Sequence, residues 1–457
     1  MFLKFDTFGK DYAQMAAIAI GCLSSCISGM TIAWSSPYIV KITQDKETYN
    51  ITEEEASYFT MINVIGLVVS LPFTSLLPDR LGRKPVLMLS ALPYSLCWLL
   101  KLFFTNVYML YIARFCAGIG DGLLFASLPL YIGEIATPEV RGVWGNGLMI
   151  FGFLGQFLIN VFGIFLTVPQ TSIVSLSVPL IFVSAFYFMP DSPYFFAMKD
   201  RDEEAKAALR FFRLRDDVDD EYKILKDDVK RQISESGTWK DLILIKSNRK
   251  AILIGIFIRV SLILSGIMVF ITYTQFIFTQ SGGNIDPAAA TLIYTGVAFV
   301  LYTIASVFSE KLGRKKAFAA SLALTSIILL LEGTYFYIQE YCPTIDLSNF
   351  KWFPLVGMLI FLVFVAFGVG ILPGLMLSEL FSASIKAKAI GVVMIIYAIM
   401  YILTNKYFYN LTRLTGLCGP FFVFGCCDMI TAVLSCFIVP ETKGKTLEEI
   451  QQSLKKN

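Results

Sequence analysis

The chain has 457 residues, of which 56% are hydrophobic and 16% are charged, and its mean hydropathy is +0.66. Soluble domains usually carry about a quarter charged residues, so this composition excludes an ordinary soluble protein. The net charge of +3 says little about partners, and the absence of histidine removes the commonest metal ligand and proton shuttle.

Apolar runs of about 20 residues recur along the whole chain, and a helix of that length crosses roughly 30 Å of hydrocarbon. The sequence predicts an all-α membrane protein with twelve transmembrane helices in two similar six-helix bundles. In the first half the predicted spans are residues 13–36, 57–78, 85–105, 108–133, 143–166 and 172–190. In the second half they are residues 251–279, 288–309, 317–338, 352–378, 387–409 and 417–440.

The loop after the first span carries Asn50-Ile51-Thr52, a sequon for N-glycosylation. Basic residues concentrate in the alternate loops, in the central segment and in the tail, whereas the loop with Asn50 has few. The positive-inside rule therefore predicts cytoplasmic termini and an outer location for Asn50.

Residues 191–247 form the only long polar stretch between the two bundles. Apolar residues recur every three or four positions in residues 205–212 and 222–233, which indicates short helices, although a disordered linker is the alternative. We therefore expect a first bundle at residues 1–190, a helical cytoplasmic linker at 191–247, a second bundle at 248–440 and a tail at 441–457.

One polar pattern occurs twice, in the same order, once in each half. It begins with residues 79–84, DRLGRK, and again with residues 310–315, EKLGRK. A glutamate and a cation seven residues apart follow each time, and an acidic residue closes each half. The members are Asp79, Arg83, Glu134, Arg141 and Asp191 in the first copy, and Glu310, Arg314, Glu379, Lys386 and Glu441 in the second. Such internal repetition is typical of transporters built from two similar halves.

Each copy lies at the predicted cytoplasmic ends of spans, where Gly82 and Gly313 are expected to permit a tight turn. We interpret the charges as a network that closes the cytoplasmic mouth of a carrier. The alternative is that the basic residues only orient the chain in the membrane. That alternative explains the cations but leaves the paired Glu134 and Glu379 unexplained.

Longer motifs around these residues resemble those of one known family. Residues 79–84 fit its loop signature, Arg114 and residues 129–142 fit the signature around its fourth span, and residues 190–193 fit the motif after its sixth. The tail, residues 439–450, is also similar. The whole chain thus resembles the sugar-porter branch of the major facilitator superfamily, particularly animal facilitated glucose carriers and insect trehalose carriers.

The resemblance implies a carrier that moves a hexose or trehalose down its gradient by alternating access. It further implies that Arg114 belongs to the cytoplasmic gate. Proton-coupled relatives have an aspartate in span one, where this chain has Thr31, which favours a uniporter. The departures from the family concern the amides that usually bind sugar hydroxyls, whose places are taken by Met149, Leu262, Ile263, Met268, Ala298, Tyr397 and Ala398.

Other polar residues inside the spans are candidates for sugar binding, since hydroxyls moved into a low-dielectric cavity need replacement partners. Gln156 and Asn160 are one helical turn apart, as are Tyr397 and Tyr401. The candidate substrate-binding residues are Thr31, Gln156, Asn160, Thr272, Tyr273, Tyr397 and Tyr401. The alternative is that such residues only join helices to one another.

Three functions remain open at this point. The first is a sugar uniporter, the second a proton-coupled symporter in which Asp121 binds the proton, and the third a sugar sensor that has lost transport. An enzyme is excluded because no nucleophile with a base, phosphate loop or metal-type cluster is visible. We expect no cofactor, no metal and no nucleic-acid partner, and we expect a monomer in the lipid bilayer of the plasma membrane.

Overall fold

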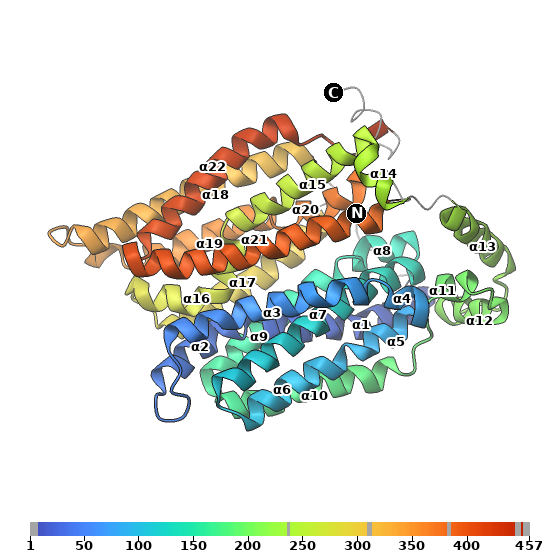
Figure 1. The fold of residues 1–457 in the computed structure, drawn as a ribbon, viewed down its shortest axis with the longest axis horizontal. Coiled ribbons are helices and arrows are strands. Elements are labelled where there is room, and N and C mark those ends of the chain that lie inside the picture. Colours follow the sequence, from blue (N-terminus) through green and yellow to red (C-terminus); the bar gives the residue numbers. More distant parts are fainter. Residues whose placement is uncertain (1–7, 235–237, 309–312, 382–384, 444–448, 451–457) are drawn as a thin grey trace. The chain divides into compact units, whose positions relative to one another are not determined.

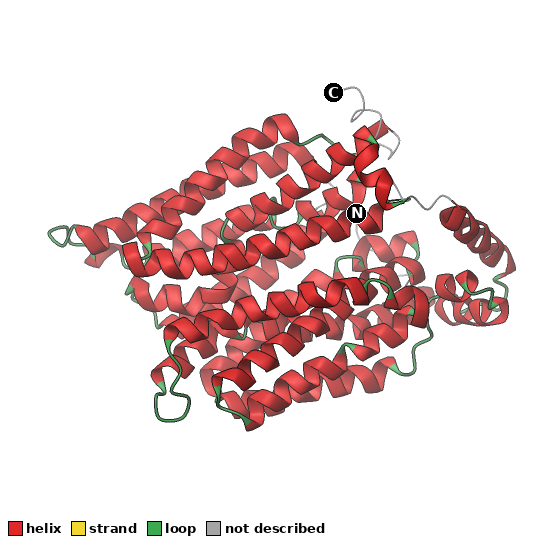
Figure 2. Cartoon of the chain, in the orientation of Figure 1, coloured by secondary structure: helices red, strands yellow, loops and turns green. Residues whose placement is uncertain are grey.

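The computed structural model describes residues 8–234, 238–308, 313–381, 385–443 and 449–450, and the elements in those ranges are all helical (Figure 2). Twelve helical stretches are long and apolar enough to cross a membrane. The predicted all-α fold with twelve spans is therefore confirmed. The spans are Asp11–Gln44, Glu53–Thr74, Arg83–Phe103, Val107–Ile135, Gly147–Phe165, Val168–Phe186, Lys246–Ser281, Pro287–Phe308, Arg314–Tyr341, Ser348–Ala366, Lys388–Thr415 and Cys418–Ile438.

The chain divides into two compact units, which are described separately (Figure 1). Unit 1 comprises Met1–Ile32, Ile62–Leu158 and Leu166–Ser236, and unit 2 comprises Ala33–Met61, Ile159–Phe165 and Gly237–Asn457. Two short segments of the first half thus group with unit 2.

Unit 1 is a bundle of long helices followed by three short helices. It contains most of α1 (Phe8–Ala33), α3 (Glu53–Thr74) and α9 (Gly147–Phe165), together with α4 (Leu77–Leu81), α5 (Arg83–Leu89), α6 (Ala91–Phe103), α7 (Val107–Ile135), α8 (Pro138–Trp144), α10 (Val168–Phe186), α11 (Pro193–Met198), α12 (Asp202–Arg213) and α13 (Asp219–Ser234).

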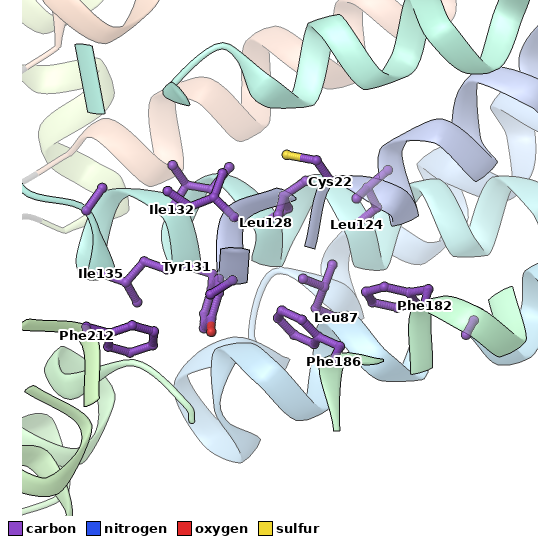
Figure 3. Packing of buried hydrophobic residues seen from close by; sticks show 14 of the residues in the cluster. Cys22, Leu87, Leu124, Leu128, Tyr131, Ile132, Ile135, Phe182, Phe186 and Phe212 are labelled. Atoms are coloured by element: carbon purple, nitrogen blue, oxygen red, sulfur yellow. The ribbon is translucent and has the colours of Figure 1, made fainter. Parts of the chain in front are cut away.

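The core of unit 1 lies along one face of α7 (Figure 3). Leu124, Leu128 and Tyr131 follow one another at helical spacing and are fully buried. The Tyr131 ring meets Phe186 of α10 at 5.2 Å and Phe212 of α12 at 6.4 Å between centroids. The end of α7 that carries Tyr131, here called the linker end, is therefore packed against the linker helices.

The helices α11, α12 and α13 form a small packed group of their own. Ala205 and Leu209 of α12 pack against Tyr222 and Val229 of α13. Lys226 also pairs with Asp202 at 2.6 Å. Exposed pairs of this kind contribute little to stability, so the apolar contact does most of the ordering.

Unit 2 is built from α2 (Ser35–Gln44), α14 (Trp239–Leu244), α15 (Lys246–Leu264), α16 (Ile267–Ser281), α17 (Pro287–Phe308), α18 (Arg314–Tyr341), η3 (Ser348–Phe350), α19 (Phe353–Ala366), α20 (Leu372–Leu380), α21 (Lys386–Thr415) and α22 (Cys418–Ile438).

The span formed by α15 and α16 is interrupted at Gly266, whose φ is +78°. A Cβ atom there would lie 2.7 Å from Phe424 Cδ2, so only glycine fits both the backbone and the packing. Just beyond the break, Phe270 packs against Phe361 and Phe421 at 5.1 and 5.2 Å between centroids. The packing of this aromatic cluster thus stabilises the break in the helix, which is not a flexible point of the chain.

Candidate functional site

The first charge cluster lies at the linker end of unit 1, and Arg83 is at its centre. The Arg83 side chain is only 3% exposed, and its Nε and Nη2 contact Glu134 Oε1 at 3.0 and 2.9 Å. Nη1 reaches Asp79 Oδ1 at 3.1 Å and the Pro78 carbonyl at 2.9 Å. The rings of Tyr194 and Phe195 cover the guanidinium at 5.7 and 5.6 Å. The structure therefore brings together the predicted residues Asp79, Arg83 and Glu134.

Asp191 closes this cluster by capping the start of α5. Its Oδ1 accepts the backbone N–H groups of Arg83 and Lys84 at 3.1 and 3.0 Å. Burial raises the pKa of Asp191, and the hydrogen bonds from the backbone of Lys84 and Ser192 offset this only in part. Free N–H groups at a helix start favour an anion there, which explains why an acidic residue follows the sixth span.

Two arginines donate hydrogen bonds to carbonyl groups at the end of α7. Arg141 donates from Nη2 to the carbonyls of Gly133 and Ala136 at 2.5 and 3.2 Å. Arg213, from the linker, donates to the Ile135 carbonyl at 2.9 Å and pairs with Glu221 at 2.7 Å. Arg141 thus satisfies the last carbonyls of α7, which have no partner within the helix. Arg213 was not a predicted site residue, and its hydrogen bond to the Ile135 carbonyl depends on the packing of α12 against this end of α7.

The second charge cluster repeats the first in unit 2. Arg314 Nη2 contacts Glu379 Oε1 at 2.8 Å, and the Thr442 hydroxyl donates to Glu379 Oε2 at 2.5 Å. Glu441 accepts the backbone N–H groups of Arg314 and Lys315 at 2.9 and 3.2 Å, at the start of α18. Arg314, Glu379 and Glu441 therefore take the places of Arg83, Glu134 and Asp191.

The titration of Glu441 differs from that of Asp191. Burial acts to raise the pKa of Glu441, but the hydrogen bonds from the backbone of Lys443, Arg314 and Lys315 outweigh it, and the pKa is lowered. Lys386 opens α21, and burial lowers its pKa while Glu379 opposes the shift. The predicted member Glu310 lies outside the described residues.

The prediction for Arg114 is wrong in its location. Arg114 lies 20 residues before Glu134 on α7, which is about 30 Å along a helix. Its Nη1 donates to the carbonyl of Thr31. The motif match identified the residue correctly but not the end of the helix on which it lies, so Arg114 is not part of the first charge cluster.

Asp121, two turns beyond Arg114, joins four helices of unit 1. Its Oδ1 accepts hydrogen bonds from Ser28 of α1 and Tyr94 of α6 at 2.6 and 2.7 Å. Its Oδ2 accepts one from Asn63 of α3 at 2.9 Å. The carboxylate is almost fully buried and has three donors, which is how a costly intramembrane charge is retained.

A row of polar residues, here called the polar ladder, runs between α15–α16 and α21 in unit 2. Thr272 Oγ1 lies 3.3 Å from the Tyr401 hydroxyl, and the Tyr401 ring lies 6.4 Å from that of Tyr397. Asn405 donates to the Tyr401 carbonyl at 2.9 Å, while its own Oδ1 is buried without a hydrogen-bond partner among the described residues. The structure thus brings together Thr272, Tyr397 and Tyr401, three of the predicted substrate residues.

Arg259 of α15 belongs to the same ladder. The carbon at the centre of its guanidinium lies 5.5 Å from the centroid of the Tyr397 ring. Gly255, one turn earlier, packs against Val393, which is one turn before Tyr397. Arg259 was not among the predicted site residues, although a lone charge within an apolar span is a sign that the sequence carries.

The remaining predicted residues lie elsewhere. The Thr31 hydroxyl donates to the Ser28 carbonyl at 2.8 Å, inside unit 1. Gln156 and Asn160 both lie on α9, where Asn160 is buried. Tyr273 packs against Phe408 at 5.1 Å between centroids, with its hydroxyl unpaired among the described residues. Asn50 is exposed in the loop between α2 and α3.

Residues 6–454 match the family described as "Sugar (and other) transporter". The chain belongs to this family. It is 32% identical to the facilitated trehalose transporter Tret1 of Polypedilum vanderplanki over 97% of this chain and 88% of that one. It is 30% identical to Tret1 of Culex quinquefasciatus, over 97% and 86%.

Among solved structures, the chain resembles the xylose transporter XylE from E. coli in its inward-open conformation. The TM-score is 0.78 at 20% identity, and the match covers 96% of this chain and 99% of that one. At this identity the likeness shows the fold alone. The protein is therefore a membrane transporter of the sugar-transporter family and not an enzyme.

Proposed function

We propose that this transporter is a facilitative carrier of a sugar that works by alternating access as a uniporter. The observation that supports it best is the polar ladder beside the interrupted span at Gly266. Interrupted helices expose polar groups at membrane depth, and transporters use them to bind substrate. The relatives named as trehalose transporters extend the proposal to a hexose or trehalose as substrate.

The two charge clusters supply the rigid helix ends that such a mechanism needs. Each cluster is built within a single unit, around Arg83 or Arg314. A cluster that is partly shielded from water can contribute to a difference of a few kcal/mol between two conformations. In this proposal the clusters face the cytoplasm, as do both termini, and a single chain in the plasma membrane is the working unit.

The test is counterflow in liposomes that contain the purified protein. Labelled glucose and trehalose should enter vesicles preloaded with the same unlabelled sugar, and empty vesicles should show no such uptake. A protonophore should leave the exchange unchanged. Net uptake into vesicles without preloaded sugar that requires an inward proton gradient would establish a symporter instead, and saturable binding without any exchange would establish a sensor.

Thr272→Val tests whether the polar ladder binds the substrate. The change keeps the shape of the side chain but removes the hydroxyl that meets Tyr401, so we expect at least a fivefold rise in the half-saturating concentration. Thr334→Val is a matched control because Thr334 is exposed on α18 and its hydroxyl donates to the Leu330 carbonyl of the same helix, at 2.8 Å. Equal effects of the two variants would contradict the proposed site.

A further inference from the structure

Arg259 stands alone as a charged residue in the apolar part of α15. The sequence from 251 to 264 is AILIGIFIRVSLIL, and no acid lies within it. A charge near the centre of a membrane helix costs about 2.5–3.5 kcal/mol on insertion scales. Such residues are normally paired, so the partners of Arg259 decide what it does.

No protein acceptor engages the Arg259 guanidinium in the described part of the chain. Its Nε is buried without a hydrogen-bond partner, and the contact that the structure records is with the face of the Tyr397 ring. A stacked aromatic ring leaves the edge of the guanidinium, with its N–H donors, free to bind an acceptor.

The groups along the ladder are polar but uncharged. Hydroxyls come from Thr272, Tyr397 and Tyr401, and an unpaired amide oxygen comes from Asn405. This combination of one cation, two aromatic rings and several neutral hydrogen-bonding groups fits a ligand with one negative end and a hydroxylated body.

We propose that the polar ladder also binds a substrate with a single carboxylate, with Arg259 as its counter-ion, so that the sugars carried include acidic ones such as a uronate or an aldonate. The inference rests on the proposed carrier function and specifies its substrate class. The planar guanidinium matches a carboxylate with two parallel hydrogen bonds. A phosphate dianion would leave one charge uncompensated by this single cation.

The proposal has an electrical consequence. A uniporter that carries a monoanion moves one negative charge in each transport cycle. Its accumulation must then follow the membrane potential, whereas that of a neutral sugar must not.

The experiment measures counterflow of labelled glucuronate in the same liposomes, beside glucose, trehalose and glucose 6-phosphate. We expect glucuronate to exchange and to compete with the neutral sugars. In vesicles without preloaded sugar, we expect its net uptake to rise when a potassium gradient with valinomycin makes the interior positive. Arg259→Gln should lower glucuronate exchange at least tenfold and lower neutral-sugar exchange by a clearly smaller factor. Arg259→Lys should retain part of the glucuronate exchange because the charge remains without the planar fork.

Lys406→Gln is the matched control. Lys406 is also a cation on a spanning helix of unit 2, but its Nζ already meets the Tyr58 hydroxyl at 3.0 Å and Glu54 at 3.7 Å. This variant should leave the ratio of glucuronate to neutral-sugar exchange as in the wild type.

Several results would overturn the inference. Saturable exchange of neutral sugars without exchange of, or competition by, glucuronate would refute it and leave the carrier function standing. So would an equal loss of acidic and neutral exchange in Arg259→Gln with an unchanged unfolding temperature, which would show a structural role. Preference for glucose 6-phosphate would refute the carboxylate class. If a folded protein exchanges none of these sugars, the proposed function itself fails.

Discussion

The two carboxylates that hold Arg83 differ greatly in exposure. The Glu134 side chain is 13% exposed and contacts the guanidinium with both oxygens, whereas that of Asp79 is 63% exposed. Removing one partner of a buried pair costs about 3–5 kcal/mol, because the other charge stays buried alone. An exposed pair contributes about 0–1 kcal/mol.

Glu134→Gln should therefore destabilise the protein by roughly 3 kcal/mol, and Asp79→Asn by less than about 1 kcal/mol. The loss should appear as a lower unfolding temperature of the detergent-purified protein and as slower sugar exchange. Similar losses in the two variants would contradict the view that Arg83 depends on its buried partner.

Asp191 and Glu441 occupy matching positions but should respond to pH in opposite ways. Asp191 has a raised pKa, so its burial as an anion costs stability that is recovered as the pH falls through this raised value. Glu441 has a lowered pKa, so its contribution is present above the ordinary glutamate value, about 4.3, and is lost at lower pH.

Unfolding temperatures of the wild type, Asp191→Asn and Glu441→Gln between pH 7 and 3.5 test this difference. Relative to Asp191→Asn, the wild type should gain stability as the pH falls from 7 towards 4. Relative to Glu441→Gln, it should keep its advantage down to about pH 4.3 and then lose it. If the difference in unfolding temperature from the wild type followed pH in the same way for both variants, the opposite pKa shifts would be refuted.

At the scale of elements, the turns that open α5 and α18 look alike in sequence but differ in backbone. Gly82 has φ 108° and ψ 160°, a region that is essentially open only to glycine, and a Cβ there would lie 2.1 Å from Asp191 Oδ2. Gly313 has φ −67° and ψ 131°, and its Cβ would meet Glu441 Oε2 at an ordinary 3.4 Å. The turn at Gly82 therefore needs the conformational freedom of glycine, whereas the backbone at Gly313 is one that any residue can adopt.

Gly82→Ala should cost about 1–3 kcal/mol in backbone strain and also displace the Asp191 carboxylate. Gly313→Ala should be close to neutral, or stabilise by a few tenths of a kcal/mol through the unfolded chain. Expression level and unfolding temperature, measured side by side, check the pair. A tolerated Gly82→Ala would show that this turn can relax.

The sequence predicted the contacts at helix ends better than those inside the bundles. Arg83 and Glu134, like Arg314 and Glu379, were predicted to share a charge network because a repeated pattern places charges beside the turns that join neighbouring spans, although the pairs themselves come from the structure. Arg114 was assigned to the wrong end because the motif was followed without regard to the 20 residues, about 30 Å of helix, that separate Arg114 from Glu134.

Contacts inside the bundles depend on how each helix is rotated, and that follows from packing rather than from spacing. The donors to Asp121 come from α1, α3 and α6, and nothing in the sequence links Ser28, Asn63 and Tyr94. The stripe of Tyr397 and Tyr401 was predictable from its spacing, whereas the contact of Tyr397 with Arg259 was not.

At the scale of the whole molecule, topology is open to a direct test through Asn50. The residue is exposed, and the sequon residue Thr52, just before α3, exchanges two hydrogen bonds with Glu55 that cap the start of the helix. If the α2–α3 loop faces outward, the chain from animal cells should carry a glycan at Asn50.

Digestion with a glycosidase should then increase the mobility of the chain on a gel, and Asn50→Gln should migrate like the digested protein. Asn410→Gln is the control, because the second sequon, Asn410-Leu411-Thr412, lies within α21. An undigested chain that migrates like Asn50→Gln would count against an outward loop.

The shared carboxylate of Asp121 has a mechanical consequence for unit 1. Four helices are fastened at one point, so none of them can slide or turn at that depth without breaking a hydrogen bond that the others also use. A bundle joined in this way resists internal shear, so it moves as one rigid body. The hinges of this motion must then lie in the connecting segments. Sequence changes there can alter the rate of the conformational change without altering the choice of substrate.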